Sequence, residues 1–172
     1  MLLANGGNDW MMLFKTGSAV DFQIATDSEA PTGRNKPVEG DQRIVMALFE
    51  GEPIAVLYKY VVPDASKPQT FSSPIGTVEV DVVKRIEDAQ IAISKGEDEY
   101  TLEAAIPLEA LDFHPQAGQK LQGDFGVIWS DALGKRNAAR CYWSNNAAGI
   151  VADLFSETKI DPKMWGKIEI VE

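Results

Sequence analysis

The segment IVMALFEGEPIAVLYKYVV, residues 44–62, decides what fold to expect. It holds two apolar runs, residues 44–49 and 54–62. Between them stands Glu50-Gly51-Glu52-Pro53, whose residue types favour a turn. Two apolar runs joined by a short turn are typical of a β-hairpin. The segment therefore predicts a pair of antiparallel strands.

Short strands broken by turn residues continue along the rest of the chain. Val20, Phe22 and Ile24 alternate with polar residues, which is the period of a half-buried strand. Further strands are expected at residues 77–83 (paired with 89–93), 100–106, 121–129, 137–143 and 167–171, with short helical segments at 108–111 and 153–159 and loops at 31–41 and 63–74. About nine or ten strand candidates at turn-spaced intervals predict an all-β, antiparallel, jelly-roll-like β-sandwich that forms one domain over residues 1–172.

The composition excludes several classes of protein. The chain has 172 residues, 45% hydrophobic and 24% charged, which suits one globular domain. Its net charge of −10 repels nucleic acid but is compatible with neutral sugars and divalent cations. No apolar run is long enough to span a bilayer, and residues 1–7 do not look like a signal peptide. The single cysteine, Cys141, excludes an intrachain disulfide and is expected to be a buried small apolar residue.

Residues with catalytic chemistry are scarce. His114 is the only histidine and stands beside a turn, which argues against a Ser-His-acid triad and a multi-histidine zinc site. The chain has no glycine-rich phosphate loop or dinucleotide fingerprint. Carboxylates are plentiful, so a glycosidase, which needs only two, stays open as an alternative. The sequence favours a domain that binds rather than catalyses.

The segment Arg140-Cys141-Tyr142-Trp143-Ser144-Asn145-Asn146 carries the side chains that a sugar site needs. Sugars stack an apolar face on an aromatic ring and hydrogen-bond planar polar groups through their hydroxyls. In an extended strand Trp143 shares a face with Asn145, where the strand should meet a loop, and Arg140 lies on the other face. Trp10 is a second candidate platform. Packing of either tryptophan in the core is the competing interpretation.

Two acidic residues raise the question of a structural metal. Asp124 and Asp131 bracket a strand and a tight turn, and calcium binds clustered carboxylate and carbonyl oxygens. The chain contains no contiguous calcium loop of the EF-hand type. A structural calcium ion is one interpretation of these two residues, and solvated surface acids are the other.

Several segments, taken together and in order, resemble the family 9 carbohydrate-binding modules and the related DOMON-type domains. These are β-sandwiches appended to secreted glycan-degrading enzymes, and related domains occur in large exported bacterial proteins. The matching segments are residues 13–17, 19–27, 100–107 and 123–127, the Tyr142-Trp143 pair, and Pro162-Lys163-Met164-Trp165-Gly166. The resemblance implies an extracellular or periplasmic location.

The resemblance also implies a binding site. Modules of this family hold a sugar at a glycan chain end between two tryptophans, assisted by acidic, arginine and asparagine side chains. By chain order Trp143 corresponds to one tryptophan, Asp21 to the acidic residue and Arg43 to the arginine. The second tryptophan has no counterpart: Lys15 falls near its place, and Trp10 stands upstream.

The start of the chain differs from the family pattern. Family members carry further strands before the segment that matches residues 13–27, and here Met1 stands close to that point. The domain is therefore expected to lack those strands or to take them from elsewhere. An uncovered sheet edge of this kind would invite a homodimer.

The leading hypothesis is a non-catalytic carbohydrate-binding module of a larger exported protein, with a polysaccharide or oligosaccharide as its partner. The candidate site residues are Trp143, Arg43, Asp21, Arg140, Asn145, Asn146 and Trp10. The first alternative is a structural or protein-interaction domain, and the second is a glycoside hydrolase. A haem-binding sandwich would need axial ligands such as His114 with Met46 or Met164. No cofactor is expected, and a structural calcium ion stays open as one interpretation of Asp124 and Asp131.

Overall fold

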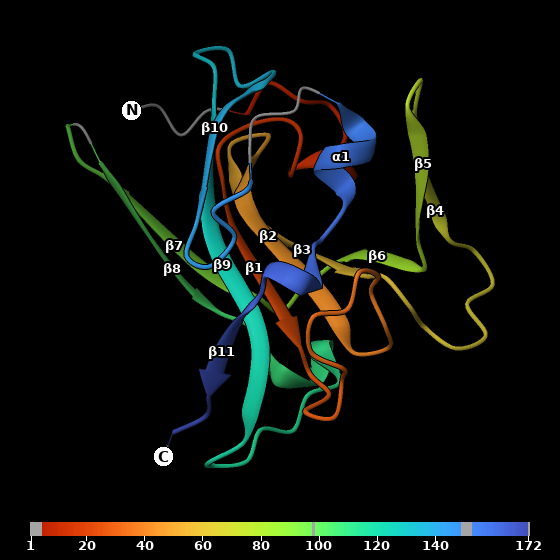
Figure 1. Ribbon diagram of the computed structural model, residues 1–172. Helices are drawn as coiled ribbons and strands as arrows, with labels where there is room; N and C mark the ends of the chain where they lie inside the picture. Colours follow the sequence, from red (N-terminus) through yellow and green to blue (C-terminus); the bar gives the residue numbers. More distant parts are fainter. Residues whose placement is uncertain (1–4, 98, 149–152, 172) are drawn as a thin grey trace.

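A computed structural model describes residues 5–97, 99–148 and 153–171 and has an all-β fold built from antiparallel strands (Figure 1). The strands are β1 (Ala19–Ala25), β2 (Asp41–Phe49), β3 (Glu52–Lys59), β4 (Gln69–Ser73), β5 (Gly76–Val80), β6 (Val82–Arg85), β7 (Gln90–Lys95), β8 (Tyr100–Ala105), β9 (Lys120–Ser130), β10 (Asn137–Tyr142) and β11 (Gly166–Glu169). The helical segments are the 3-10 turns η1 (Trp10–Met12), η2 (Leu108–Leu111) and η3 (Pro162–Met164) and the short helix α1 (Leu154–Thr158).

The β2–β3 hairpin lies near the centre of a seven-stranded sheet, in the order β10-β9-β1-β2-β3-β6 with β11 also paired to β9. Phe49 pairs with Glu52, so the connecting loop has only two residues. Glu50 and Gly51 both have positive φ angles, of 53° and 89°, as the tight primed turns of hairpins require. The hairpin expected from the sequence is confirmed, with a tighter turn because β3 already begins at Glu52.

The long strand β9 organises one edge of this sheet. One of its sides pairs with β1 along most of its length. Its other side is shared: β11 pairs with residues 120–123 and β10 with residues 126–130. Two strands that are distant in the sequence therefore lie along the same side of β9, one after the other (Figure 1).

Both faces of the large sheet carry an apolar cluster. On one, called here the α1 face, Phe14, Val45, Tyr58 and Ile128 pack beneath Leu154 of α1. On the other, called the hairpin face, the cluster receives apolar side chains of the β7–β8 hairpin and of η2. Members of this second cluster are Ile24, Ile44, Leu57, Leu121, Ile91 and Leu102. Figure 1 shows the β4–β5 hairpin at the right of this view and the β7–β8 hairpin at the left.

Three sequence predictions, two about the strands and one about Cys141, are wrong. Residues 77–83 do not form one strand paired with 89–93. The strand is interrupted at Asp81, whose carboxylate accepts the Val62 N–H at 2.8 Å, so β5 ends before it and β6 begins after it. Strand β7 pairs with β8 instead. Part of the expected loop 63–74 forms β4, which pairs with β5. Cys141 is exposed rather than buried, because it lies on the edge strand β10.

No helix in the part of the chain that the structure describes is long and apolar enough to cross a membrane.

A buried ion pair joins β1 to β2 on the α1 face. Arg43 donates from Nε to both oxygens of Asp21 (3.1 and 3.0 Å) and from Nη2 to Oδ2 (2.6 Å). The two residues are 1% and 0% exposed. Burial alone would lower the pKa of Arg43, but the attraction of Asp21 raises it well above its ordinary value. Arg43 is therefore a permanent cation inside the protein, and it also lies over the Phe14 ring at 5.0 Å.

Arg43→Met is expected to lower the free energy of unfolding by about 3–5 kcal/mol, because it leaves the buried Asp21 carboxylate without its cation. Urea unfolding measures this loss. The double variant Asp21→Leu with Arg43→Met removes both charges and should lose less than Arg43→Met alone.

The matched control is Asp112→Asn, which breaks the ion pair of Lys59 with the largely exposed Asp112. Asparagine tolerates the left-handed backbone of this position, where φ is 50°. This change should cost less than about 1 kcal/mol. Equal losses in Arg43→Met and Asp112→Asn would contradict a dominant role for the buried pair.

Candidate functional site

A pocket of about 380 Å³ opens on the α1 face, and it is called here the first pocket. The sheet contributes Gln23 from β1 and Arg140 and Tyr142 from β10. The opposite wall is formed by residues 156–157 of α1 and residues 159–161 that follow it. Asn35, Asn145, Ala147 and Ala148 complete the lining. The pocket thus collects side chains from five separate parts of the chain.

Tyr142 connects the pocket to the buried ion pair. Its ring lies directly over Gly126 of β9, where an added Cβ would come within 2.6 Å of the ring. Its hydroxyl donates to Asp21 Oδ2 at 2.5 Å. Burial first, and then the charge of Asp21, raise the pKa of Tyr142, so the phenol stays protonated at neutral pH. Because its proton is used by Asp21, the hydroxyl is left to accept a hydrogen bond from a ligand.

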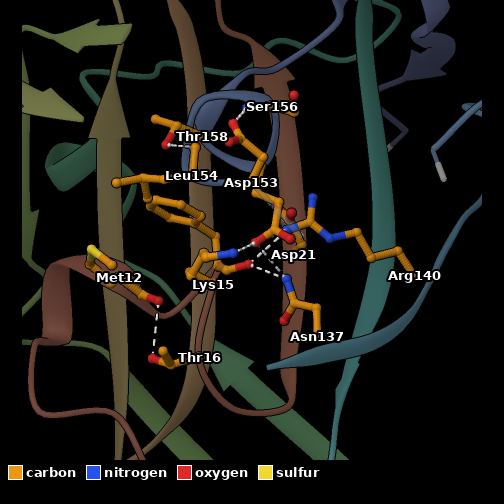
Figure 2. A network of polar contacts seen from close by, with 12 residues as sticks. Met12, Lys15, Thr16, Asp21, Asn137, Arg140, Asp153, Leu154, Ser156 and Thr158 are labelled. Atoms are coloured by element: carbon orange, nitrogen blue, oxygen red, sulfur yellow. Dashed lines mark hydrogen bonds and ion pairs between the residues drawn. The ribbon is translucent and has the colours of Figure 1, made fainter. Parts of the chain in front are cut away.

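Glu157 is the centre of a second polar cluster beside the pocket. Its Oε2 atom lies 3.3 Å from Lys15 Nζ and 3.4 Å from Arg140 Nη2. The same oxygen accepts a hydrogen bond from Asn137 Nδ2 at 3.0 Å. Figure 2 shows Lys15, from the segment after η1, and Asn137 and Arg140, both from β10, converging from two parts of the chain. Asn137 and Arg140 also donate to the Phe14 carbonyl, at 2.9 and 2.7 Å, which anchors β10 to the segment after η1.

The helix that carries Glu157 is short but well fixed. Asp153 caps its N-terminus by accepting the Phe155 N–H at 2.9 Å, and it also accepts the hydroxyl of Ser73 at 3.0 Å. At the other end, the buried Arg43 donates from Nη1 to the Glu157 carbonyl at 2.9 Å. One wall of the pocket is therefore bonded to β4 and to the buried ion pair.

The wall around Asn35 is held by Arg34. Its Nε atom donates to Asp41 Oδ2 at 2.9 Å, and its Nη1 atom donates to Gln122 Oε1 at 3.1 Å. The guanidinium also lies over the Trp165 ring at 5.2 Å. The loop 31–41, expected as a surface loop, is therefore tied to the sheet at its middle.

Four of the residues expected at a binding site gather at this pocket. Arg140 and Asn145 line it. Asp21 and Arg43 lie beneath Tyr142 and are almost completely buried, so they support the pocket rather than form its surface. Gln23 extends the same network, because its Oε1 atom accepts the indole N–H of Trp165 at 3.0 Å.

Trp143 lies on the hairpin face, opposite the pocket. Its ring stacks on Phe125, with centroids 5.4 Å apart and planes 12° from parallel. It also packs against Gly166, where an added Cβ would come within 2.4 Å of the ring. Both aromatic side chains are half exposed, at 50% and 51%. Trp143 is therefore neither a core residue nor part of the first pocket.

The expected shared face of Trp143 and Asn145 is wrong because β10 ends at Tyr142. Beyond that point Asp124 accepts the backbone N–H groups of Ser144 (2.9 Å) and Asn145 (3.0 Å). This contact takes the chain back to the α1 face, where Asn145 joins the pocket. Asn146 is exposed and does not line it.

Both acidic metal candidates accept hydrogen bonds from the backbone. Asp124 is spent on backbone amides, and Asp131 accepts the Lys135 N–H at 2.9 Å in a turn. Seven residues of extended chain separate the two, a span of about 23 Å. Within residues 5–97, 99–148 and 153–171, no group of three or more His, Cys, Asp or Glu side chains could hold a metal ion.

Trp10 lies outside the first pocket and does not act there as a second aromatic platform. It begins η1 behind the N-cap Asp9 and packs, partly buried, against the apolar cluster of the α1 face. It does not line the first pocket. The geometry does not bring Trp10 and Trp143 together as two sides of a sugar clamp.

No known family model, curated protein or solved structure matches this chain. The resemblance to family 9 modules therefore stays a prediction. The chemistry of the pocket rests on its own side chains. Planar or hydroxyl-bearing neutral groups come from Gln23, Asn35, Tyr142 and Asn145, while Arg140 and Lys159 are balanced by Glu157 and Asp161. Such a lining suits a neutral ligand rich in hydroxyl groups.

Glu157→Gln is expected to gain stability relative to the wild type as the pH rises. Burial raises the pKa of the Glu157 carboxyl, while Arg140 and Lys15 oppose the shift. The folded protein therefore keeps this proton at pH values where the unfolded chain has released it. The contribution of Glu157 to the free energy of unfolding of the wild type therefore falls as the pH rises from about 4.3, the ordinary pKa of glutamate, through the higher pKa of the folded state.

Urea unfolding of both proteins across this range measures the effect, with Glu103→Gln on the exposed surface of β8 as the matched control. A stability difference between Glu157→Gln and wild type that stays constant with pH would contradict the raised pKa.

Proposed function

We propose that this domain is a non-catalytic carbohydrate-binding module, with the first pocket as its sugar site. The observation that carries the proposal is a preformed, charge-balanced pocket lined by planar polar groups. At about 380 Å³ it falls in the lower part of the range of small-molecule sites. By the sequence resemblance, the fold would be a reduced β-sandwich, and the parent protein would act outside the cell or in the periplasm.

The pocket offers both partners that a sugar hydroxyl needs. Tyr142 presents a hydroxyl that can accept, since its proton is held by Asp21. Asn145 uses Oδ1 to accept the Ala147 N–H at 3.0 Å, and its Nδ2 group carries donors for a ligand oxygen. The buried ion pair fixes Tyr142 before any ligand arrives, which lowers the entropy lost on binding.

Asn145→Ala is expected to weaken glycan binding by about tenfold, because a polar contact to the sugar is lost. Asn146→Ala, one residue along and outside the pocket, is the matched control and should bind like the wild type. A glycan array followed by calorimetry, with and without calcium, measures both. Release of reducing ends is followed in parallel, because Glu157 and Asp161 both line the pocket and a hydrolase would need two such carboxylates.

Failure of the folded wild type to bind any glycan would refute the proposal. Equal losses in Asn145→Ala and Asn146→Ala would place the site elsewhere.

The second candidate is a protein-interaction domain, favoured by the exposed Phe125–Trp143 stack. Two half-exposed, parallel aromatic rings on one face are typical of a contact surface. Such a surface could also accept a polysaccharide outside the pocket or a second copy of the chain, as the sequence analysis anticipated for Trp143 and for a homodimer.

Trp143→Ala distinguishes these roles, and it should leave the fold intact because half of the ring is already exposed. With the first pocket as the sugar site, this variant binds short sugars within about twofold of the wild type. Loss of all glycan binding would move the sugar site to the Phe125–Trp143 stack. Loss of self-association alone, measured by light scattering, would assign the stack to a protein contact.

A further inference from the structure

A second pocket, of about 400 Å³, adjoins the first one on the α1 face. The two share Asn35, Lys159 and Ile160 in their linings. These three residues therefore stand between the pockets and contact both. Beyond them the second pocket extends away from β10 and reaches the strand β5.

The second pocket has a different character from the first. Its apolar part comes from Pro37, Tyr60, Val61 and Val78. Thr77 and Glu79 add polar groups, and both are exposed. An apolar surface edged by polar side chains matches a sugar ring, which has an apolar face and hydroxyls around its rim.

The walls of the second pocket are held by contacts outside it. The Tyr60 hydroxyl donates to the Thr158 carbonyl at the end of α1, and burial raises the pKa of Tyr60 to about 12. The Phe155 ring packs against Gly76 at the start of β5, where an added Cβ would come within 2.6 Å of the ring. Lys159 Nζ lies 3.5 Å from the centre of that ring. Helix α1 and the β4–β5 hairpin are thus joined into one wall.

The charges along both pockets cancel. Arg140, Lys159 and Lys36 are cationic, and Glu157, Asp161 and Glu79 are anionic. The whole chain, in contrast, carries a net charge of −10. A surface that is neutral on an acidic protein favours a neutral ligand over an acidic one.

From these observations we infer that the two pockets form one groove that binds a neutral glycan over several consecutive sugar units. The inference rests on the proposed function and deepens it. One sugar unit occupies the first pocket, the chain crosses beside Lys159 and Ile160, and a later unit lies against Val78 and Pro37. A longer oligosaccharide then makes contacts that a short one cannot reach.

The test compares the disaccharide and the hexasaccharide of the cello-, xylo- and laminari-series by calorimetry. The wild type is expected to bind the hexasaccharide of its preferred series about tenfold more tightly than the disaccharide. Thr77→Trp, which fills the second pocket from the exposed surface of β5, should abolish this gain and leave disaccharide affinity unchanged. Thr101→Trp is the matched control, the same change on the exposed surface of β8, and should keep the gain.

The outcomes separate the inference from the function on which it rests. Equal affinities for disaccharide and hexasaccharide in the wild type would overturn the groove but leave a single-pocket sugar site standing. Persistence of the length gain in Thr77→Trp would also overturn it. Absence of binding to all six oligosaccharides would overturn the groove, and absence of binding to every member of the glycan array as well would overturn the proposed function. Tighter binding of oligogalacturonides, which are acidic, than of these neutral chains would contradict the charge argument.

Discussion

The buried pair of Asp21 and Arg43 is the interaction on which the rest of this structure depends. It joins two central strands of the large sheet, and each partner also makes a hydrogen bond to a residue of another element. Asp21 receives the hydroxyl of Tyr142 from the edge strand, and Arg43 donates to the end of α1. A buried charge pair is costly to desolvate, so it contributes more to a unique arrangement than to net stability. Here that arrangement holds both walls of the first pocket in place.

The strand pattern could be predicted from the sequence because alternation and turn residues are local signals. The β2–β3 hairpin, β1, β8, β9, β10 and η2 lie where the sequence analysis expects them, within the usual uncertainty at the ends of elements. The pairing of strands was harder to predict. A single contact, the bond from the Val62 N–H to Asp81, divides β5 from β6 and sends them to different partners. The residue pattern around Asp81 does not reveal this contact, because its partner Val62 lies 19 residues earlier in the chain, before β4.

The site was predictable only where its residues are neighbours in the chain. Arg140 and Asn145 come from one polar segment, and both line the pocket. Glu157, Gln23 and Asn35 have no local signal, because each reaches the site through the packing of a different element. Tyr142 could have been predicted as a site residue, because it stands two residues after Arg140 in β10 and its side chain therefore points to the same face of the sheet. The prediction that Trp143 and Asn145 share a face was wrong because it extended the alternation of a strand beyond Tyr142, where β10 ends.

Asp124 stands opposite the gap between β10 and β11, the two strands that share the outer side of β9. Its carboxylate accepts the backbone N–H groups of Ser144 and Asn145, just past the end of β10. A single side chain thus replaces a stretch of backbone ladder, and the segment beginning at Asn145 leaves the sheet without disturbing any strand register. Residues could be inserted or exchanged after Asn145 at little cost to the scaffold. Diversification of ligand preference among proteins built this way should concentrate at that junction, much as variable loops do on an invariant framework.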